Sequence, residues 1–423
     1  MIPAFIKKIT GNSRGVKALG IYTISNFLSK AISFASLPLF TYILEKKDFG
    51  TISLFSATVS FAMPFVSLGI LYSTSTDYFR LEKKEFASFI SSTFYLPMIT
   101  AILMGLLFFL FYPFLLEITG FAPLFIWLIP IVVYANFLIE QNLILVRSKE
   151  QPILFLCINI GKIIIELGLA LFLILAFHYG WLGRISGIAV SFLFAAVFSI
   201  LYLRHYGYLS GKIRSAVILK EIIYSIPAIV MQVSIFCISM SDRYFINYYY
   251  GEERTGVYSV ATTFASVLLI FCTALLQFFS PRLYGELSRN ASAGVYMRLF
   301  LKYAGILILG FAGLAVFTPV AYYYFINKGF SEGLSYFYLL LTGNLAWCLA
   351  YFMYSFLLYH KAKRKILLLS AGIILISLTV NMVLTKNYAE TGAALGSLVN
   401  SFCALILVYL VTYKYFRHNE KVS

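Results

Sequence analysis

Long apolar runs alternate with short polar connectors from one end of the chain to the other. Each run holds roughly 20 or more residues, the length that an α-helix needs to cross the hydrocarbon core of a bilayer. The pattern predicts twelve membrane spans, at residues 18–44, 51–75, 86–112, 123–146, 152–177, 185–203, 222–250, 255–280, 299–326, 333–359, 366–385 and 392–415. We therefore expect an all-α polytopic membrane protein with about twelve transmembrane helices.

The composition agrees with this pattern. Hydrophobic residues make up 61% of the chain and charged residues only 12%, with a mean hydropathy of +0.87. These values exclude a soluble globular domain. The first apolar run is too long for a signal peptide and contains Lys30, so it is predicted to remain as a span. No connector is long enough to fold alone, and substrate handling is expected within the helix bundle.

Basic residues are distributed unequally between the two sides of the predicted bundle. With the N-terminus inside, the inner segments hold 24 Lys and Arg residues and the outer loops hold 6, namely Lys46, Lys47, Arg184, Arg254, Lys328 and Lys386. Because basic residues accumulate in cytoplasmic loops, both termini are predicted to be cytoplasmic. This asymmetry accounts for the net charge of +16, so no nucleic-acid partner is expected.

Cysteine and histidine positions do not suggest a metal site. The five cysteines are scattered within the predicted spans, and the four histidines lie at span ends or in loops without clustering. The cysteines are interpreted as small buried hydrophobic residues. We expect neither a metal nor a cofactor.

The two halves of the chain share a plan at an offset of 205 or 206 residues. Residues 48–53 match 254–259 in a shared Gly and Ser, and residues 186–189 match 391–394 at nearly the same offset. The simplest explanation is a duplicated unit of six spans. Two such units would be related by a pseudo-two-fold axis along the membrane normal, as in several transporters. The expected division is an N-terminal lobe at 1–205, a cytoplasmic connector at 206–221 and a C-terminal lobe at 222–423.

Three cations, Lys30, Lys162 and Arg243, lie inside predicted spans. A charge at that depth is costly unless it faces a polar cavity or a partner, so these residues are candidates for binding an anionic substrate. Lys30 and Lys162 are expected near the midplane of the first lobe, about 15–18 Å deep. Lys30 has no local partner in the sequence and is the strongest candidate, with Asn26 one turn away on the same face.

Three carboxylates also lie within the spans, and each leaves alternatives open. Glu166 is four residues from Lys162 and could neutralise it. Asp242 and Arg243 could each pair with another helix, or Arg243 could extend to the outer interface. Glu140 could pair with a cation across the lobe or accept a coupling proton, and the former is favoured.

Prolines within the spans introduce bends, which serve gating in some transporters and packing in many other membrane helices. Pro38 and Pro227 are the leading hinge candidates, because each lies in the first helix of its lobe.

A stretch of the second half resembles a known family. Its segments are Ser225-Ile226-Pro227, Ser241-Asp242-Arg243-Tyr244-Phe245-Ile246, Gly251, Gly256-Val257-Tyr258-Ser259-Val260-Ala261 and Ser280-Pro281-Arg282-Leu283-Tyr284. They resemble the polysaccharide transport family of the multidrug/oligosaccharidyl-lipid/polysaccharide exporter superfamily, in particular the O-antigen flippases (Wzx type). The chain length and the twelve predicted spans agree with that family.

The resemblance implies a flippase, and not an enzyme, that moves polyprenyl-pyrophosphate-linked oligosaccharide units to the outer leaflet of the bacterial plasma (inner) membrane. Its expected partners are that lipid-linked oligosaccharide, the surrounding membrane lipids and a polysaccharide polymerase complex. The surface glycan implied is O-antigen of lipopolysaccharide or a similar polysaccharide.

Two other functions are alternatives. A cation-coupled drug antiporter of the same superfamily is compatible with the equal numbers of intramembrane carboxylates and cations, but the family motif favours the flippase. A membrane-embedded glycan polymerase or acyltransferase would be expected to carry a sizeable external loop or a histidine motif, and the sequence has neither.

Overall fold

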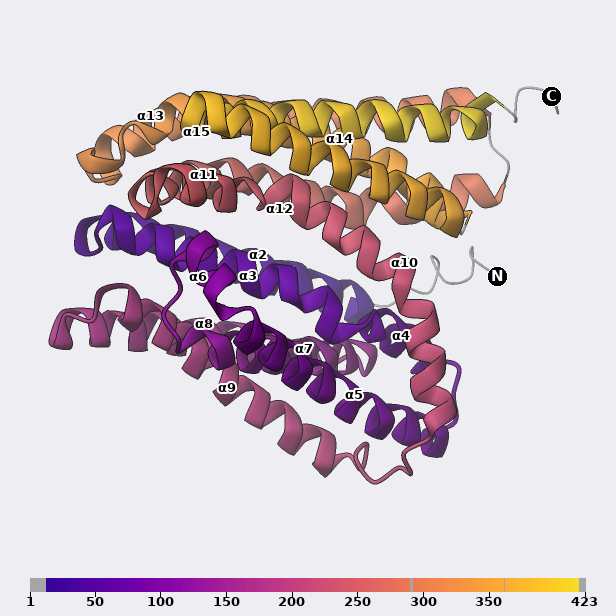
Figure 1. Cartoon of the computed structure of the whole chain (residues 1–423). Helices are drawn as coiled ribbons and strands as arrows, with labels where there is room; N and C mark the ends of the chain where they lie inside the picture. The colour runs from indigo at the N-terminus through magenta and orange to yellow at the C-terminus, as the bar shows by residue number, and fades with distance from the viewer. Residues whose placement is uncertain (1–12, 290–291, 361, 418–423) are drawn as a thin grey trace. The chain divides into compact units, whose positions relative to one another are not determined.

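The structure, a computed structural model, describes residues 13–289, 292–360 and 362–417. Lys7, Lys8, Lys361 and Lys421, which contribute to the predicted charge asymmetry, lie outside the described residues. Figure 1 shows the described chain as a set of long helices joined by short connectors.

Within these described ranges the regular elements are all helical. They are α2 (Ser13–Ile43), α3 (Lys46–Ser67), α4 (Ile70–Asp77), α5 (Lys83–Leu110), α6 (Tyr112–Thr119), α7 (Phe125–Ser148), α8 (Pro152–Phe177), α9 (Gly180–His205), α10 (Ser215–Ser239), α11 (Asp242–Tyr250), α12 (Glu252–Ser288), α13 (Ala293–Phe325), the 3₁₀ turn η1 (Lys328–Phe330), α14 (Gly333–Tyr359) and α15 (Lys363–Arg417).

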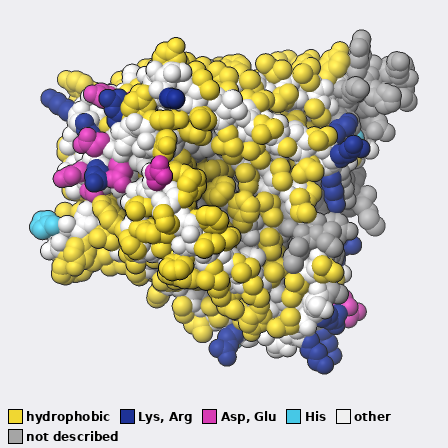
Figure 2. Space-filling view, viewed as in Figure 1, with side chains coloured by type: hydrophobic (Ala, Val, Ile, Leu, Met, Phe, Trp, Pro, Cys, Tyr) yellow, Lys and Arg dark blue, Asp and Glu magenta, His cyan; other side chains and the backbone are white. Residues whose placement is uncertain are grey.

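Helices satisfy every backbone hydrogen bond internally, which the hydrocarbon core of a membrane requires. Many large apolar side chains on their outer surfaces remain exposed, including Leu103, Leu106 and Leu107 of α5 and Leu309 and Val316 of α13. On the face shown in Figure 2, hydrophobic side chains cover the helices and the charged side chains gather near helix ends. These surfaces suit contact with lipid.

In the described part of the chain, nine helices are long and apolar enough to cross a membrane, or ten if the bent pair α10–α11 is one span. Helix α15 covers the last two predicted spans and has non-helical backbone angles at Tyr388 and Ala389. Helix α2 covers the first predicted span. With α15 counted as two spans and α2 included, the arrangement agrees with a twelve-span membrane protein.

The chain folds into two compact units. Unit 1 holds the chain up to Ser36 and from Thr51 to Gln232, whereas unit 2 holds Leu37–Gly50 and the chain from Val233 onward. Helix α3 therefore contributes its first turn to unit 2 and the rest to unit 1. Helices α2 and α10 are divided in the opposite order, with their first part in unit 1 and their end in unit 2.

Helix α7 lies at the centre of unit 1. Its buried residues Gln141 and Asn142 donate hydrogen bonds to Thr93 of α5 and to Ser199 of α9, at 3.4 and 3.2 Å. Amide side chains buried in this way connect helices within a membrane bundle. Neighbouring helices are thereby held at a defined register around α7.

The segment after α9 is attached to the start of α5. Ser91 donates to the carbonyl of Tyr208, and the amides of Gly211 and Arg214 donate to the hydroxyls of Ser91 and Ser92, at 3.1 and 3.0 Å. The predicted connector 206–221 therefore contains a packed turn, followed by the first residues of α10.

Two glycines allow a close helix contact inside unit 2. A Cβ atom on Gly256 of α12 would collide with the carbonyl oxygen of Lys46, and a Cβ on Gly50 would collide with that of Glu252. The exposed Lys47 forms an ion pair with the partly buried Glu252 beside this contact, at 3.6 Å. The absence of side chains at the two glycines lets the first turns of α3 and α12 approach backbone to backbone.

Candidate functional site

Lys162 of α8 lies against α7 and α9 within unit 1. Its Nζ stands 4.1 Å from the centre of the Phe192 ring, and it interacts electrostatically with Glu140 of α7 and with Glu166 of its own helix. An ammonium over an aromatic face is partly stabilised by the negative ring face. Lys162 therefore has neighbours that offset its charge, and Glu140 is one of them.

Glu166 forms its ion pair with Arg184 of α9. The Nη2 and Oε1 atoms are 2.8 Å apart, and both side chains are largely buried, at 14% and 12% exposure. The prediction that Arg184 belongs to an outer loop is wrong, because α9 begins at Gly180 and includes Arg184 in its second turn. The helix begins five residues before the predicted span because Gly180, Trp181, Leu182 and Gly183 extend the apolar run.

Lys30 lies exposed on α2, one helical turn after the half-buried Asn26. Among the described residues, no ion pair or hydrogen bond involves Lys30. Its charge is thus not neutralised by a neighbouring carboxylate within the described chain. The midplane depth expected for Lys30 and Lys162 stays a prediction.

The polar residues of α7 divide between two faces. Gln141 and Asn142 are buried against α5 and α9, whereas Glu140 and Arg147 are exposed. Glu140, Ile144 and Arg147 share one helical face, because side chains three and four residues apart lie above one another. Glu140 also interacts electrostatically with Arg147.

A bend of 49° separates α10 from α11 in unit 2. Asp242, 2% exposed, follows the bend and accepts hydrogen bonds from the Arg243 amide and the Tyr258 hydroxyl. Arg243 donates to the Thr262 hydroxyl at 3.1 Å, and its buried Nε atom has no hydrogen-bond partner among the described residues. The two adjacent residues thus connect the bend to α12 by separate contacts.

Sequence reasoning missed the amides that complete this network. Asn381 of α15 donates to Ser241 at 2.9 Å, and Asn400, later in the same helix, donates to Asn381 at 3.0 Å. Both amides are almost fully buried. A buried amide in a predicted span was the available signal, since polar side chains in membrane helices usually face partners inside the bundle.

The hinge candidates Pro38 and Pro227 lie inside α2 and α10, and both helices continue through them. The Thr41 hydroxyl donates to the carbonyl of Pro38 at 2.7 Å. Interruptions in the described chain occur elsewhere, among them Leu68–Gly69 between α3 and α4, the α10–α11 bend, and Tyr388–Ala389 in α15. A hinge role for either proline remains a prediction.

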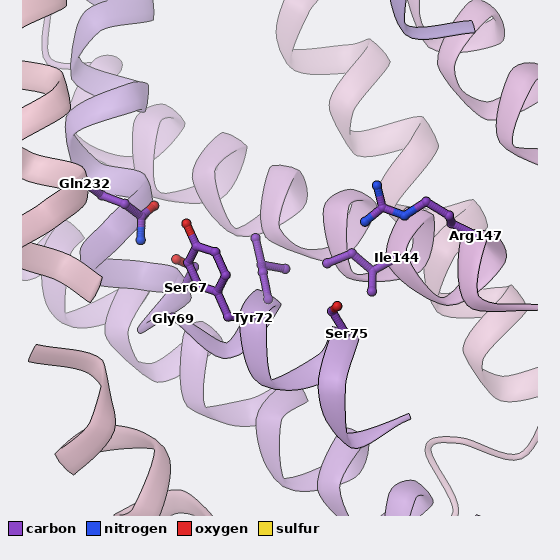
Figure 3. A pocket seen from close by; sticks show the side chains of 8 residues that line it. Ser67, Gly69, Tyr72, Ser75, Ile144, Arg147 and Gln232 are labelled. Atoms are coloured by element: carbon purple, nitrogen blue, oxygen red, sulfur yellow. The ribbon is translucent and has the colours of Figure 1, made fainter. Parts of the chain in front are cut away.

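A cavity of about 290 Å³ adjoins the interruption between α3 and α4 in unit 1. It is lined by Ser67, Gly69, Leu71, Tyr72, Ser75, Ile144, Arg147 and Gln232. Figure 3 shows Arg147 and Ile144 contributed by one helix, with Tyr72 and Ser75 contributed by another. Among the described lining residues Arg147 is the one that carries a charge. From the sequence it was one of the 24 basic residues of the inner segments and not a site candidate.

Lys149, two residues beyond Arg147, is surrounded by tyrosine rings. Its Nζ lies 3.1 Å from the ring centre of Tyr206 and about 5 Å from those of Tyr202 and Tyr208, at 5.0 and 4.8 Å. Burial and the neighbouring Lys83 charge lower the pKa of Lys149 to about 8, whereas the ring faces oppose that shift. The contact fixes the turn between α7 and α8 to the end of α9.

Among the described residues, no group of three His, Cys, Asp or Glu side chains is arranged to hold a metal ion.

Comparison with known proteins identifies the chain's family. The family model described as polysaccharide biosynthesis protein matches residues 16–284, which is more than half of the chain. No curated protein matches the sequence.

Solved structures agree with the fold at low sequence identity. An inward-facing multidrug resistance transporter of the MATE family, in the MOP superfamily, is 13% identical with a TM-score of 0.71, covering 96% of this chain and 99% of its own. The lipid II flippase MurJ, in an inward closed conformation, is 12% identical with a TM-score of 0.70, covering 94% and 90%. A MOP superfamily transporter from Pyrococcus furiosus is 13% identical with a TM-score of 0.58, covering 98% of both chains.

Proposed function

Because the chain belongs to the polysaccharide biosynthesis protein family, we propose that it is a flippase for a polyprenyl-pyrophosphate-linked oligosaccharide. It would move this lipid from the cytoplasmic to the outer leaflet of a bacterial plasma membrane by alternating access. The product would serve O-antigen or a similar surface polysaccharide, and a polymerase complex would act after it. Both termini would be cytoplasmic.

The observation that carries this proposal is the charge of Lys30, which has no ion pair among the described residues and lies in the first predicted membrane span. A pyrophosphate bears several negative charges, and a cation without a carboxylate partner in the described chain is available to it. The substrate's polyprenyl tail would remain in contact with lipid, so only its polar head needs a hydrated route. Two further cations contribute positive potential but are less free to contact the head group. Lys162 is balanced by Glu140 and Glu166, and Arg243 is hydrogen-bonded to Thr262.

The similarity to MurJ supports a lipid-linked glycan as cargo, since that protein is described as a lipid II flippase. The similarity to a multidrug transporter of the same superfamily keeps a drug antiporter as the alternative. The family match favours the glycan pathway over drug export. The likeness in fold to a transporter and a flippase favours transport over a polymerase or acyltransferase.

We further propose that Asp242 takes part in coupling transport to a cation. A buried carboxyl group within a membrane span is a functional candidate by default, and Asp242 retains both oxygens in a polar network with Tyr258 and Arg243. Substituting Asp242→Asn keeps the size of the side chain and removes its charge. Loss of transport driven by an imposed proton or sodium gradient, with unchanged protein yield, would support coupling; normal gradient-driven transport would reject it.

Deletion of the gene tests the principal proposal. It should leave glycosyltransferase activity intact, abolish the polymerised surface glycan and cause lipid-linked units to accumulate in the inner leaflet. Leaflet-resolved detection of the lipid-linked unit separates the alternatives. A membrane enzyme would leave its unprocessed substrate on the outer leaflet, whereas a drug antiporter would change toxin sensitivity without affecting the glycan. Appearance of the unit on the outer face at the normal rate, in a strain without a second flippase, would reject the proposal.

A further inference from the structure

We infer that the cavity beside the α3–α4 interruption is a loading site for the phosphate-bearing head of the lipid-linked substrate. The inference rests on the proposed flippase function and assigns its first binding step to residues outside the intramembrane cations. The ligand chemistry is a phosphate ester or pyrophosphate, held chiefly by Arg147.

The cavity lies beside an interruption of the helix, and Gly69 of that interruption lines it. Leu68 and Gly69 adopt consecutive left-handed conformations, with φ of 47° and 68°, and they separate α3 from α4. A left-handed conformation is uncommon for leucine and easy for glycine. The interruption changes the course of the chain and leaves room between α4 and the end of α7.

The lining chemistry suits an anion. Arg147 supplies the one charge among the described lining residues, and Ser67, Tyr72 and Ser75 supply hydroxyl groups that can donate hydrogen bonds. None of the described residues that line the cavity is a carboxylate. An arginine can hold two phosphate oxygens at once with parallel N–H groups, which a lysine cannot do.

Arg147 is available for such a contact. It is exposed, and no ion pair joins it to another described residue. The helix end that carries Arg147 is anchored two residues further on, where the Lys149 ammonium lies over the Tyr206 ring.

The size of the cavity limits what it can take. At about 290 Å³, it lies at the lower end of the range of roughly 300–1,000 Å³ typical of small-molecule sites. It therefore suits a compact phosphate-bearing head rather than an entire oligosaccharide. Leu71 and Ile144 provide apolar surface in the same cavity, which is compatible with the start of a lipid tail.

The face of α7 continues from this cavity toward the intramembrane charges. Arg147 and Glu140 share that face and are separated by seven residues, or about 10 Å along the helix axis. Glu140 in turn interacts with Lys162. A head group released from Arg147 would thus meet a region whose acidic charge is already balanced by a lysine.

Arg204 offers a matched control for Arg147. Each is an exposed arginine in the last turn of a unit 1 helix, α9 for Arg204, and Arg204 does not line the cavity. Replacing either by glutamine removes the same charge. Arg147→Lys retains the charge and removes the bidentate geometry.

The test measures binding to the purified full-length protein in nanodiscs of neutral lipid. Four probes are compared: polyprenyl pyrophosphate, polyprenyl alcohol, phosphatidylglycerol and inorganic pyrophosphate. We expect Arg147→Gln to weaken polyprenyl pyrophosphate binding by about tenfold to a hundredfold, as the loss of a charge-assisted contact predicts. Arg147→Lys should lie between this variant and the wild type. Arg204→Gln should bind polyprenyl pyrophosphate as the wild type does. Binding of polyprenyl alcohol should be the same in all variants.

Each contrary result has a defined meaning. Wild-type affinity in Arg147→Gln, or equal weakening by Arg204→Gln, would overturn the site. Equal weakening of phosphatidylglycerol binding would identify a general phospholipid headgroup site and overturn its assignment to the substrate. Weaker binding of inorganic pyrophosphate by Arg147→Gln than by the wild type would support a phosphate site. Thermal unfolding of Arg147→Gln near the wild-type temperature shows that the variant is folded.

The flippase function itself is tested separately, with the wild-type protein. If its deletion leaves leaflet transfer intact, the proposed function fails. If the wild type transfers the lipid and Arg147→Gln binds and transfers it equally well, the loading site alone fails.

Discussion

Gly256 lies directly against the backbone of Lys46, with no space between them for a side chain. The same relationship joins Gly50 to Glu252, so each glycine faces the first turn of the other helix. Gly50 and Gly256 are separated by 206 residues, the offset at which the two halves of the sequence match. The shared glycine of the repeat therefore has a packing reason at both of its positions.

Substitution of Gly256→Ala should destabilise unit 2. The new methyl group must displace the Lys46 carbonyl, and overpacking of this kind costs about 1–3 kcal/mol. Gly285→Ala in the same helix is the control, because a Cβ there meets nothing within 4 Å. Thermal unfolding in detergent should show a lower midpoint for Gly256→Ala and an unchanged or higher midpoint for Gly285→Ala. Equal midpoints would mean that the α3–α12 contact adjusts freely.

The ion pair between Glu166 and Arg184 should be structural. Removing one member leaves a largely buried charge without its partner, and such losses cost about 3–5 kcal/mol. Arg184→Gln and Glu166→Gln should each lower the unfolding midpoint, whereas the double variant should recover much of the loss. Additive losses in this double-mutant cycle would show that the two side chains are energetically independent.

The positions of the membrane helices could be predicted because apolar length follows from bilayer thickness. Helix ends were harder to predict. Arg184 seemed to mark a loop because a charge ordinarily ends an apolar run, but Glu166 on the neighbouring helix stabilises it inside the bundle. A partner eighteen residues away, across a turn, is not visible in the local pattern.

Interruptions within helices were not predictable from proline. Pro38 and Pro227 lie in continuous helices, whereas the chain is interrupted at Leu68–Gly69, which contains no proline. Glycine at position 69 was the available signal, but glycines are common within membrane helices and most do not break them. The cavity that Arg147 lines lies beside that interruption, so it could be recognised only from the structure.

Lys149 provides a test of pH dependence outside the membrane spans. Its pKa in the folded protein is about 8, below the ordinary 10.5, so folding disfavours its protonated form. The resulting destabilisation is complete below about pH 8 and disappears above about pH 10.5. Raising the pH through this window should therefore increase the unfolding midpoint of the wild type relative to Lys149→Met.

Subtracting the unfolding midpoint of Lys149→Met from that of the wild type at each pH cancels the contribution of the other titrating groups. If the wild type instead loses stability relative to Lys149→Met as pH rises, attraction between the ammonium and the rings of Tyr202, Tyr206 and Tyr208 outweighs the cost of its burial.

The predicted orientation can be tested with single cysteines on exposed loop residues. Lys212→Cys should be labelled from the cytoplasm, and Lys328→Cys should be labelled from outside. Lys212 is preferable to Gly211, because a side chain at Gly211 would collide with the backbone of Ala87 and Ser88. Both variants must be made in a protein whose five native cysteines have been replaced. Labelling of both positions from one side would contradict the charge-based orientation.

Lys30 should be required for transport although it has no structural partner among the described residues. Lys30→Ala removes the charge proposed to attract the pyrophosphate, and we expect a loss of transport of about tenfold or more. Protein yield and the unfolding midpoint should stay near wild type, because no described ion pair is broken. Lys30→Arg should retain part of the activity, since it preserves the charge and changes its geometry.

Leaflet-resolved detection of the lipid-linked unit measures the effect of the Lys30 variants. Lys328→Ala, which removes an exposed loop charge, serves as the control. Normal transfer by Lys30→Ala at normal protein level would show that this lysine does not bind the substrate, whereas loss of the protein from the membrane would assign it a structural role.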